Sequence, residues 1–489
     1  MPRSDRLIGI SALAPFLPRL RIDLRAWCRW TGRDEERVLR GTGSGFRMPG
    51  PREDAITMAA AAVMRLVRSG KADPQRIGFL ALATESARDD AVGTVIVKGL
   101  VDLALQAEGR EMLARDCEVP EFKQACLAGV YATKAAARWL AWDGSGRQAI
   151  VVASDVAAYP RGGTGEPTQG AGAVAVLLEE DPLLLQMDLL ASAGTSMFRE
   201  ADFRKPVLRH ILARGGSRPA VANEFPSYDG PWSTICYLDE TLRAIEALAR
   251  RRQTDVAGLL DSVTAAFFHR PYRKMPIQAL ALLRLRALAG EGERAEELEQ
   301  LCREGGIVAD RVRAELAAGP ETGKAGEEAW PAVDAAWRLL RGRETFRREA
   351  DALLGLGDVR MSECGNLYAG SILAWMAAGL EEAATIGRDL AGARVLAVGY
   401  GSGNAAEAAL LQVAPGWRGA ARRIGFGPAL DGAIDLSQEE YDSLHDGRPV
   451  GEVLDLSSDG FLLDRVGWRS GPRSDAGAEY YAFDPSWRS

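Results

Sequence analysis

The chain has 489 residues, 60 of them basic and 67 acidic, so its formal charge is -7. No basic block of the kind that tracks a phosphate backbone occurs, which argues against a nucleic-acid partner. Hydrophobic residues make up 47% of the chain and predict a large core, yet no uncharged apolar run approaches the roughly 18 residues that cross a bilayer. Because a signal-peptide cleavage pattern is also missing, we expect a soluble cytoplasmic protein without a membrane partner.

Strands and helices are predicted to alternate along the chain. The predicted strands cover residues 7–14, 77–83, 148–154, 172–178 and 393–398, and the predicted helices cover 54–69, 127–142 and an alanine-rich stretch at 405–413. The run at 77–83 is apolar throughout, as in a strand that is buried on both faces. This alternation indicates an α/β protein.

Cysteine and histidine are both sparse. The six cysteines form no CxxC pair and no spacing typical of a zinc site, so free thiols and no bound metal are predicted. The three histidines are His210, His269 and His445. His210 and His445 are interpreted as ordinary surface or core side chains.

Three short motifs supply a thiol, a carboxylate and an imidazole. Glu85 follows the strand at 77–83, Cys126 precedes the helix at 127–142, and His269 opens the run His-Arg-Pro-Tyr-Arg-Lys-Met. The positive end of a helix favours a thiolate, which can carry an acyl group, while a carboxylate can remove a weakly acidic C–H proton. Together they indicate acyl transfer with carbon–carbon bond formation. Taken singly, each has a plain alternative: a buried small side chain, a helix cap and a core histidine.

A glycine-rich run follows the strand at 393–398. It reads Gly-Tyr-Gly-Ser-Gly-Asn over residues 399–404, and its glycines let the backbone approach a ligand closely. Its spacing does not match a dinucleotide-binding fingerprint. The alternative is a simple strand-to-helix turn.

The order of these motifs resembles the hydroxymethylglutaryl-CoA synthases, members of the thiolase-like condensing-enzyme superfamily. The resemblance rests on the runs at 9–12, 41–43, 53–59, 84–86, 125–126, 166–173, 269–275, 365–371 and 399–403. It departs from the family around the base, where Ser86 to Asp90 differ, and behind the thiol, where Leu127 to Val130 differ.

The resemblance implies a role for each residue of a site. Cys126 would accept an acetyl group from acetyl-CoA, Glu85 would deprotonate that group, and His269 would contact the acceptor, acetoacetyl-CoA. Oxyanion and substrate contacts are expected from Asn366, Tyr400, Gly401 and Ser402, supporting pocket contacts from Asp155 and Tyr159, and a coenzyme contact from Lys274. The reaction implied makes 3-hydroxy-3-methylglutaryl-CoA for isoprenoid precursors through the mevalonate pathway, and it uses no permanently bound cofactor.

The same resemblance implies a layered αβαβα fold of two similar halves, at residues 1–180 and 181–489, in a homodimer. A polar stretch at about 284–358, rich in Arg, Glu and Ala, is predicted to be a helical insertion in the second half. It is interpreted as a passive insertion, with a surface elaboration, a subunit contact or a docking site as alternatives.

Two alternative functions stay open. One is a β-branching relative that condenses onto chains held by an acyl carrier protein in polyketide synthesis; the other is a non-catalytic scaffold. Retention of Glu85, Cys126 and His269 argues against the scaffold. The cations Arg204, Lys205, Arg270, Arg273 and Lys274 suit either a coenzyme or an acidic carrier protein.

Overall fold

A continuous sheet whose strand order repeats about its middle forms the core of the protein. The computed structural model describes residues 6–87, 92–199, 202–206, 225–320, 329–448, 450–451, 454, 456–472 and 474–488. Within these ranges the sheet runs β5 (Glu121–Phe122), β4 (Ile77–Ala83), β6 (Gln148–Ala157), β7 (Gly170–Glu180), β1 (Ile8–Phe16), β8 (Leu185–Ser196), β11 (Ala405–Val413), β10 (Arg394–Gly401) and β9 (Ala265–Phe268).

The two ends of the sheet mirror each other. From the outside inward, β4, β6, β7 and β1 correspond to β9, β10, β11 and β8. In each set the outer pair is parallel and the other pairs are antiparallel. In each parallel pair, a helix precedes the inner strand along the chain. This helix is α5 (Ala128–Trp142) before β6 and α15 (Ser371–Thr385) before β10. The protein therefore has a thiolase-like layered α/β fold built from two similar halves.

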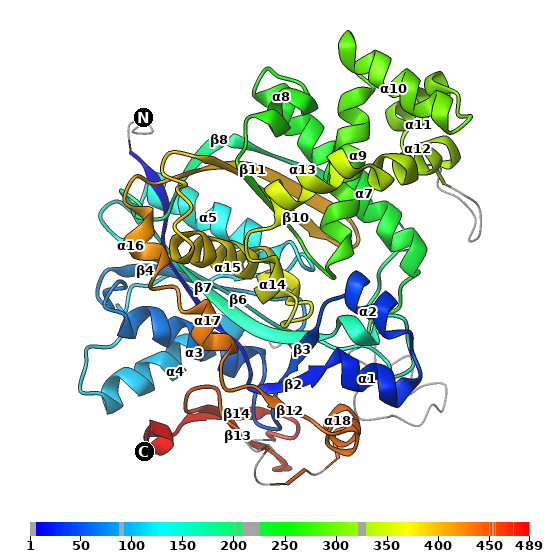
Figure 1. Cartoon of the computed structure of the whole chain (residues 1–489). Coiled ribbons are helices and arrows are strands. Elements are labelled where there is room, and N and C mark those ends of the chain that lie inside the picture. The colour runs from blue at the N-terminus through cyan, green and yellow to red at the C-terminus, as the bar shows by residue number, and fades with distance from the viewer. Residues whose placement is uncertain are drawn as a thin grey trace.

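Helices α5 and α15 occupy the central layer, between the two ends of the sheet (Figure 1). All seven residues of β4 are buried because both of its faces are covered. Phe79, Ala81 and Ala83 face the core that contains α5, whereas Leu80 and Leu82 face α3 (Ala55–Arg68) and α4 (Gly93–Ala107). On the far side, α7 (Gly230–Arg251), α8 (Val256–Asp261) and α9 (Lys274–Leu288) cover the second half.

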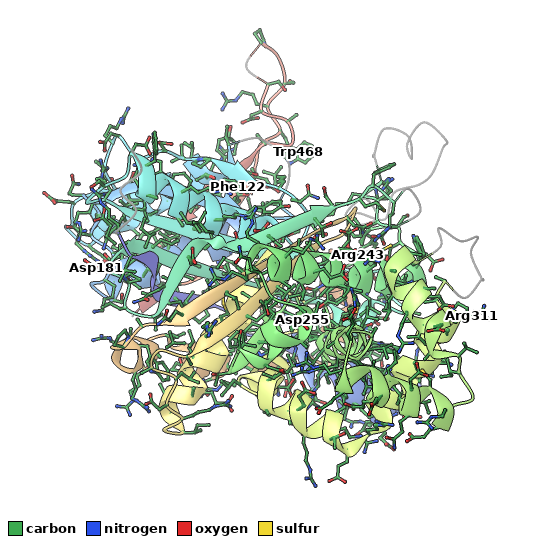
Figure 2. The ribbon with its side chains drawn as sticks, turned by 90° about the horizontal axis from the view of Figure 1, so that it is seen from above. Phe122, Asp181, Arg243, Asp255, Arg311 and Trp468 are labelled. Carbon is green, nitrogen blue, oxygen red and sulfur yellow. The ribbon has the colours of Figure 1, made fainter. Side chains whose placement is uncertain are left out.

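Small elements close the two sides of this core. Near the N-terminus lie β2 (Leu20–Asp23), α1 (Leu24–Thr31), α2 (Glu35–Gly41) and β3 (Gly45–Met48), joined by β12 (Ile434–Asp435). The C-terminal part adds α16 (Trp417–Ala421), α17 (Phe426–Leu430), α18 (Gln438–His445) and the hairpin β13 (Phe461–Val466) with β14 (Glu479–Phe483). Figure 2 places Trp468 on the C-terminal segment that projects from the body.

Short helices fill most of the stretch at 284–358. They are α10 (Glu293–Glu304), α11 (Ala309–Ala318), α12 (Pro331–Gly342) and α13 (Glu344–Leu354), followed by α14 (Asp358–Met361). Helices α10, α11 and α12 lie beyond α9, whereas α13 lies against β9 and α14 beside α15 (Figure 1). Within the described part of the chain, no helix has both the length and the apolar character required to cross a membrane.

One predicted element is wrong. Residues 405–413 form strand β11 instead of an alanine-rich helix, and β11 pairs with β10 and β8 in the middle of the sheet. Alanine favours helices in isolation, but a mostly buried run between two strands gains more from ladder hydrogen bonds and packing. The glycine run before it is therefore a hairpin turn between β10 and β11.

Candidate active site

One cavity gathers most of the polar residues that the sequence analysis singled out. Its volume is about 680 Å³, and it lies at the ends of β4 and β9 and at the start of α5. Its lining includes Glu85, Cys126, Tyr159, His269, Lys274, Asn366, Tyr400 and Ser402. Asp155 and Gly401 lie behind this lining. Both halves of the fold therefore contribute side chains to one site.

A strained loop presents Cys126 at the amino end of α5. Ala125 has a φ of 47°, a left-handed conformation that costs a non-glycine residue about 1–2 kcal/mol. Gly401 of β10 packs against the same loop, where an added Cβ would lie 2.3 Å from the carbonyl oxygen of Gln124. The side chain of Cys126 is 7% exposed. This packing fixes the thiol in the wall of the cavity.

The thiol of Cys126 donates a hydrogen bond to Glu85, with 3.0 Å between Sγ and Oε2. Burial raises the pKa of Glu85 to about 7. Burial and then the negative charge of Glu85 raise the pKa of Cys126 well above its ordinary value. The expectation that the helix end would favour a thiolate is therefore wrong, because desolvation and a facing carboxylate outweigh the helix. The resting pair is a thiol beside its proton acceptor.

Asp155 anchors the loop that carries Glu85. Its Oδ1 accepts hydrogen bonds from the backbone N–H groups of Glu85 and Ser86, both at 2.8 Å. The same oxygen accepts from the hydroxyls of Thr84 at 2.9 Å and Ser86 at 2.7 Å. Oδ2 accepts from the N–H of Ala369 at 2.9 Å. Strand β6 continues to Ala157, past the predicted end at 154, so this fully buried carboxylate lies within the sheet and ties the two halves together.

His269 faces the cavity as a neutral imidazole. Its side chain is 2% exposed, and desolvation lowers its pKa to about 3. Its backbone N–H donates to the carbonyl of Val398 at 2.7 Å, and the Tyr237 hydroxyl donates to its carbonyl at 2.9 Å. Among the described residues, Nδ1 has no hydrogen-bond partner. A neutral ring fixed through its backbone is suited to hydrogen-bond a ligand oxygen.

The β10–β11 hairpin holds Tyr400 beside the imidazole, with 6.4 Å between the ring centroids and 26° between the planes. The Tyr400 hydroxyl donates to Asp202 Oδ2 at 3.3 Å and accepts from Asn404 Nδ2 at 2.6 Å. Asn404 also donates to Asp202. Ser402 lines the cavity at the turn. The hydroxyl of Tyr400 is thus engaged in a buried network, and its ring is the part that borders His269.

Asn366 enters the cavity from the segment before α15. Its side-chain Oδ1 accepts from the N–H of Tyr368 at 2.9 Å, and its own N–H donates to the carbonyl of Thr168 at 3.1 Å. Within the part of the chain that the structure describes, its Nδ2 has no hydrogen-bond partner. Asn366 is 2% exposed and lines the cavity, so this amide nitrogen is a donor available to a ligand there.

Comparisons with known proteins identify the family of the chain. Residues 4–182 match the family model described as hydroxymethylglutaryl-coenzyme A synthase N terminal. A hydroxymethylglutaryl-CoA synthase of Haloferax volcanii is 30% identical over 460 residues, covering 90% of this chain and 91% of that protein. The chain belongs to the hydroxymethylglutaryl-CoA synthase family.

Two solved structures show the same fold as this family member. MvaS in complex with 3-hydroxy-3-methylglutaryl coenzyme A has a TM-score of 0.74 and 26% identity, covering 98% of this chain and 99% of that chain. The curacin biosynthetic pathway HMG synthase in complex with acetyl donor-ACP has a TM-score of 0.69 at 19% identity, with 98% and 100% covered. At that identity the second similarity concerns the fold alone.

Tyr228 and Tyr368, which the sequence analysis missed, line this cavity beside the predicted Tyr159. Tyr159 packs edge-on against Tyr228 at 5.7 Å and against Tyr368 at 6.4 Å between ring centroids. His445 is buried, and its Nε2 lies 2.8 Å from the carbonyl oxygen of Tyr159. Tyr368 lies inside the motif at 365–371 and could have been found there. Tyr228 gives no local signal.

The cations that the sequence singled out do not all lie in the cavity. Arg270 and Arg273 both bind Asp358, so they stabilise the segment before α9. Lys205 donates to the backbone carbonyl of Glu85 at 2.8 Å, and Lys274 lines the cavity. His210 lies outside the described residues.

Proposed function

We propose that the protein is a hydroxymethylglutaryl-CoA synthase that joins the acetyl group of acetyl-CoA to acetoacetyl-CoA. The observation that carries this proposal is the buried contact between Cys126 Sγ and Glu85 Oε2, in the cavity that also contains His269. A thiol beside a carboxylate can accept an acyl group, and the same carboxylate can then deprotonate it. The Haloferax relative and the MvaS structure support the substrate class.

In the first step, Glu85 takes the proton of Cys126 as sulfur attacks the acetyl carbonyl of acetyl-CoA. The bond between the carbonyl carbon and the CoA sulfur breaks, and the leaving thiolate takes the proton from Glu85. This leaves an acetyl thioester on Cys126 and an ionised Glu85. A pKa of about 7 suits a group that must accept and release a proton near neutral pH.

In the second step, the Glu85 carboxylate removes a proton from the acetyl methyl group. The enolate carbon attacks the ketone carbon of acetoacetyl-CoA, and the ketone oxygen becomes an alkoxide. Neutral His269 hydrogen-bonds this oxygen, which then takes up the proton that Glu85 removed and becomes the hydroxyl, while Asn366 Nδ2 and Ser402 are donors available to the thioester oxygens. Water then cleaves the bond to Cys126 and releases the product. The atoms balance without an added metal or redox group.

Intact-protein mass spectrometry tests this scheme. Incubation with acetyl-CoA should add one acetyl group to the wild type and none to Cys126→Ala. Adding acetoacetyl-CoA should discharge it, whereas Glu85→Ala should not complete condensation. Discharge by an acetoacetyl carrier protein alone would replace the CoA acceptor with the carrier-bound one. An unmodified wild type with either donor, CoA-bound or carrier-bound, would favour a scaffold role.

We also propose that the two halves divide near residue 180 and that the protein is a homodimer in the cytoplasm. The division is supported by the mirrored strand order, since β7 ends at Glu180 and β8 begins at Leu185. The homodimer follows from the family resemblance. The unpaired state of all six cysteines suits a reducing compartment.

A further inference from the structure

A second cavity adjoins the proposed active site and is partly walled by the insertion. Its volume is about 640 Å³, a size typical of small-molecule sites. Residues from α2, the start of α9, α12 and α13 line it, and it shares Arg37, Gly41 and Lys274 with the first cavity. A ligand that extends out of the catalytic cavity past Lys274 therefore enters this second space.

Cations from both sides face this second cavity. Arg37 and Arg40 come from α2, Lys274 begins α9, Arg341 lies on α12 and Arg347 on α13. In the described ranges, only Arg40 has an ion pair, a 3.5 Å contact with Glu36 on its own helix. Arg341 instead lies over the ring of Trp337, at 4.3 Å from the centroid.

The like charges in this cluster affect one another. Burial lowers the pKa of Lys274, and the charges of Arg341, Arg40 and Arg37 lower it further. Cations that repel one another around a cavity are stabilised when an anion binds between them. Arginine is particularly suited to phosphate, because its planar fork donates two parallel hydrogen bonds.

We propose that the insertion helices α12 and α13 supply Arg341 and Arg347 to bind the phosphates at the nucleotide end of the CoA substrates. This inference rests on the proposed function, since it assigns the remote end of the same thioester substrate. It gives the stretch at 284–358 a role in substrate choice, where the sequence suggested a passive insertion.

The volume and the net charge of the cavity favour a nucleotide. The cations line a half-open cavity of about 640 Å³ between helices, a volume that suits a small phosphorylated ligand. The carboxylates of Asp34, Glu36 and Asp351 also line it, but they are outnumbered by the five cations, so the cavity keeps a net positive charge that favours phosphate.

The test compares acetyl donors that share the reacting thioester but differ at the remote end. Acetyl-CoA, acetyl-3′-dephospho-CoA, acetyl-pantetheine and an acetylated carrier protein are each used to acetylate the wild type, Arg341→Gln and Arg347→Gln. With acetyl-CoA we expect KM to rise about 10-fold or more in each variant, the size of one lost charged hydrogen bond, with kcat within about twofold. With acetyl-pantetheine we expect no change, since it lacks the nucleotide.

Matched variants separate the cavity from general surface charge. Arg338→Gln on α12 and Arg348→Gln on α13 remove arginines whose side chains are 66% and 79% exposed and which pair with Asp334 and Glu344 on their own helices. They should leave KM for acetyl-CoA unchanged. Because Arg341 is half-buried, Arg341→Lys should restore part of the affinity, and exposed Arg347 provides a second test if Arg341→Gln does not fold.

The outcomes distinguish this inference from the proposed function. An unchanged KM for acetyl-CoA in folded Arg341→Gln and Arg347→Gln, or an equal loss with acetyl-pantetheine, would overturn the inference alone. A loss seen only with an acetylated carrier protein would overturn it in favour of that partner. A wild type that forms no acetyl adduct with any donor would overturn the proposed function and this inference with it.

Discussion

Cys126 and Glu85 lie 3.0 Å apart, from Sγ to Oε2, at the two places where the first half of the fold ends a strand and begins a central helix. The second half repeats this geometry with different residues. His269 directly follows β9 and Glu85 lies two residues after β4, while Tyr368, with a φ of 42°, precedes α15 by the same interval as Ala125 precedes α5. The duplicated fold thus offers two corresponding positions for a site. In the first half this position holds the thiol and its base, and in the second half it holds His269 and Tyr368.

Glu85→Gln should make Cys126 more acidic. The carboxylate raises the pKa of the thiol, so its replacement by a neutral amide should lower that pKa, although burial still keeps it above the ordinary value. The pH profile of Cys126 alkylation by iodoacetamide should therefore move to lower pH. Asp116→Asn, which removes an exposed carboxylate bound to Arg147, should leave the profile unchanged. A shift to higher pH in Glu85→Gln would contradict the geometry.

The rate of condensation should increase with pH through about 7. Glu85 must be ionised to deprotonate the acetyl group, and burial raises its pKa to about 7. His269, with a pKa lowered to about 3, stays neutral throughout and contributes no second step between pH 5 and 9. A pH profile of kcat measures this directly. An additional step near pH 6 that disappears in His269→Asn would show that the imidazole titrates after all.

Glu85→Gln should stabilise the folded protein more at pH 8 than at pH 5. The folded pKa of about 7 is above the ordinary 4.5, so folding favours the protonated acid. The penalty on the ionised form therefore grows as pH rises from 4.5 to 7 and is constant above that, reaching at most about 3 kcal/mol. Urea unfolding of both proteins at the two pH values measures it. An equal effect at both pH values would contradict the raised pKa.

Asp155→Asn should weaken both the fold and the site. The amide loses the negative charge that five donors share and presents an N–H group to donors, which should cost about 3 kcal/mol of unfolding free energy. Because Asp155 positions the Glu85 loop, kcat should fall even at temperatures where the variant is fully folded. The exposed change Asp116→Asn should cost less than about 1 kcal/mol. Full activity in folded Asp155→Asn would remove this positioning role.

The sequence predicted local features well where the local signal and the tertiary context agree. The apolar run at 77–83 is strand β4, and the helix predicted over 54–69 is α3, with Asp54 capping it through the N–H groups of Ile56 and Thr57. It failed where context decides. The run at 405–413 is a strand only because it lies between β10 and β8. The protonation of Cys126 depends on a carboxylate 41 residues away in the sequence. The second cavity forms between helices that come together only in the folded chain.

Gly401→Ala should slow the acetylation of Cys126 by displacing the loop that carries it. A Cβ at this position would lie 2.3 Å from the carbonyl oxygen of Gln124, which is backbone and cannot rotate away, so the loop that holds Cys126 must move. We expect acetylation of Cys126 to slow about 100-fold, since displacement by about 1 Å costs that much in an oriented reaction. Gly419→Ala in α16, where a Cβ meets nothing within 4 Å, should acetylate normally. Mass spectrometry measures the rate of acetylation. If folded Gly401→Ala is acetylated as fast as the wild type, the loop is not held by this contact.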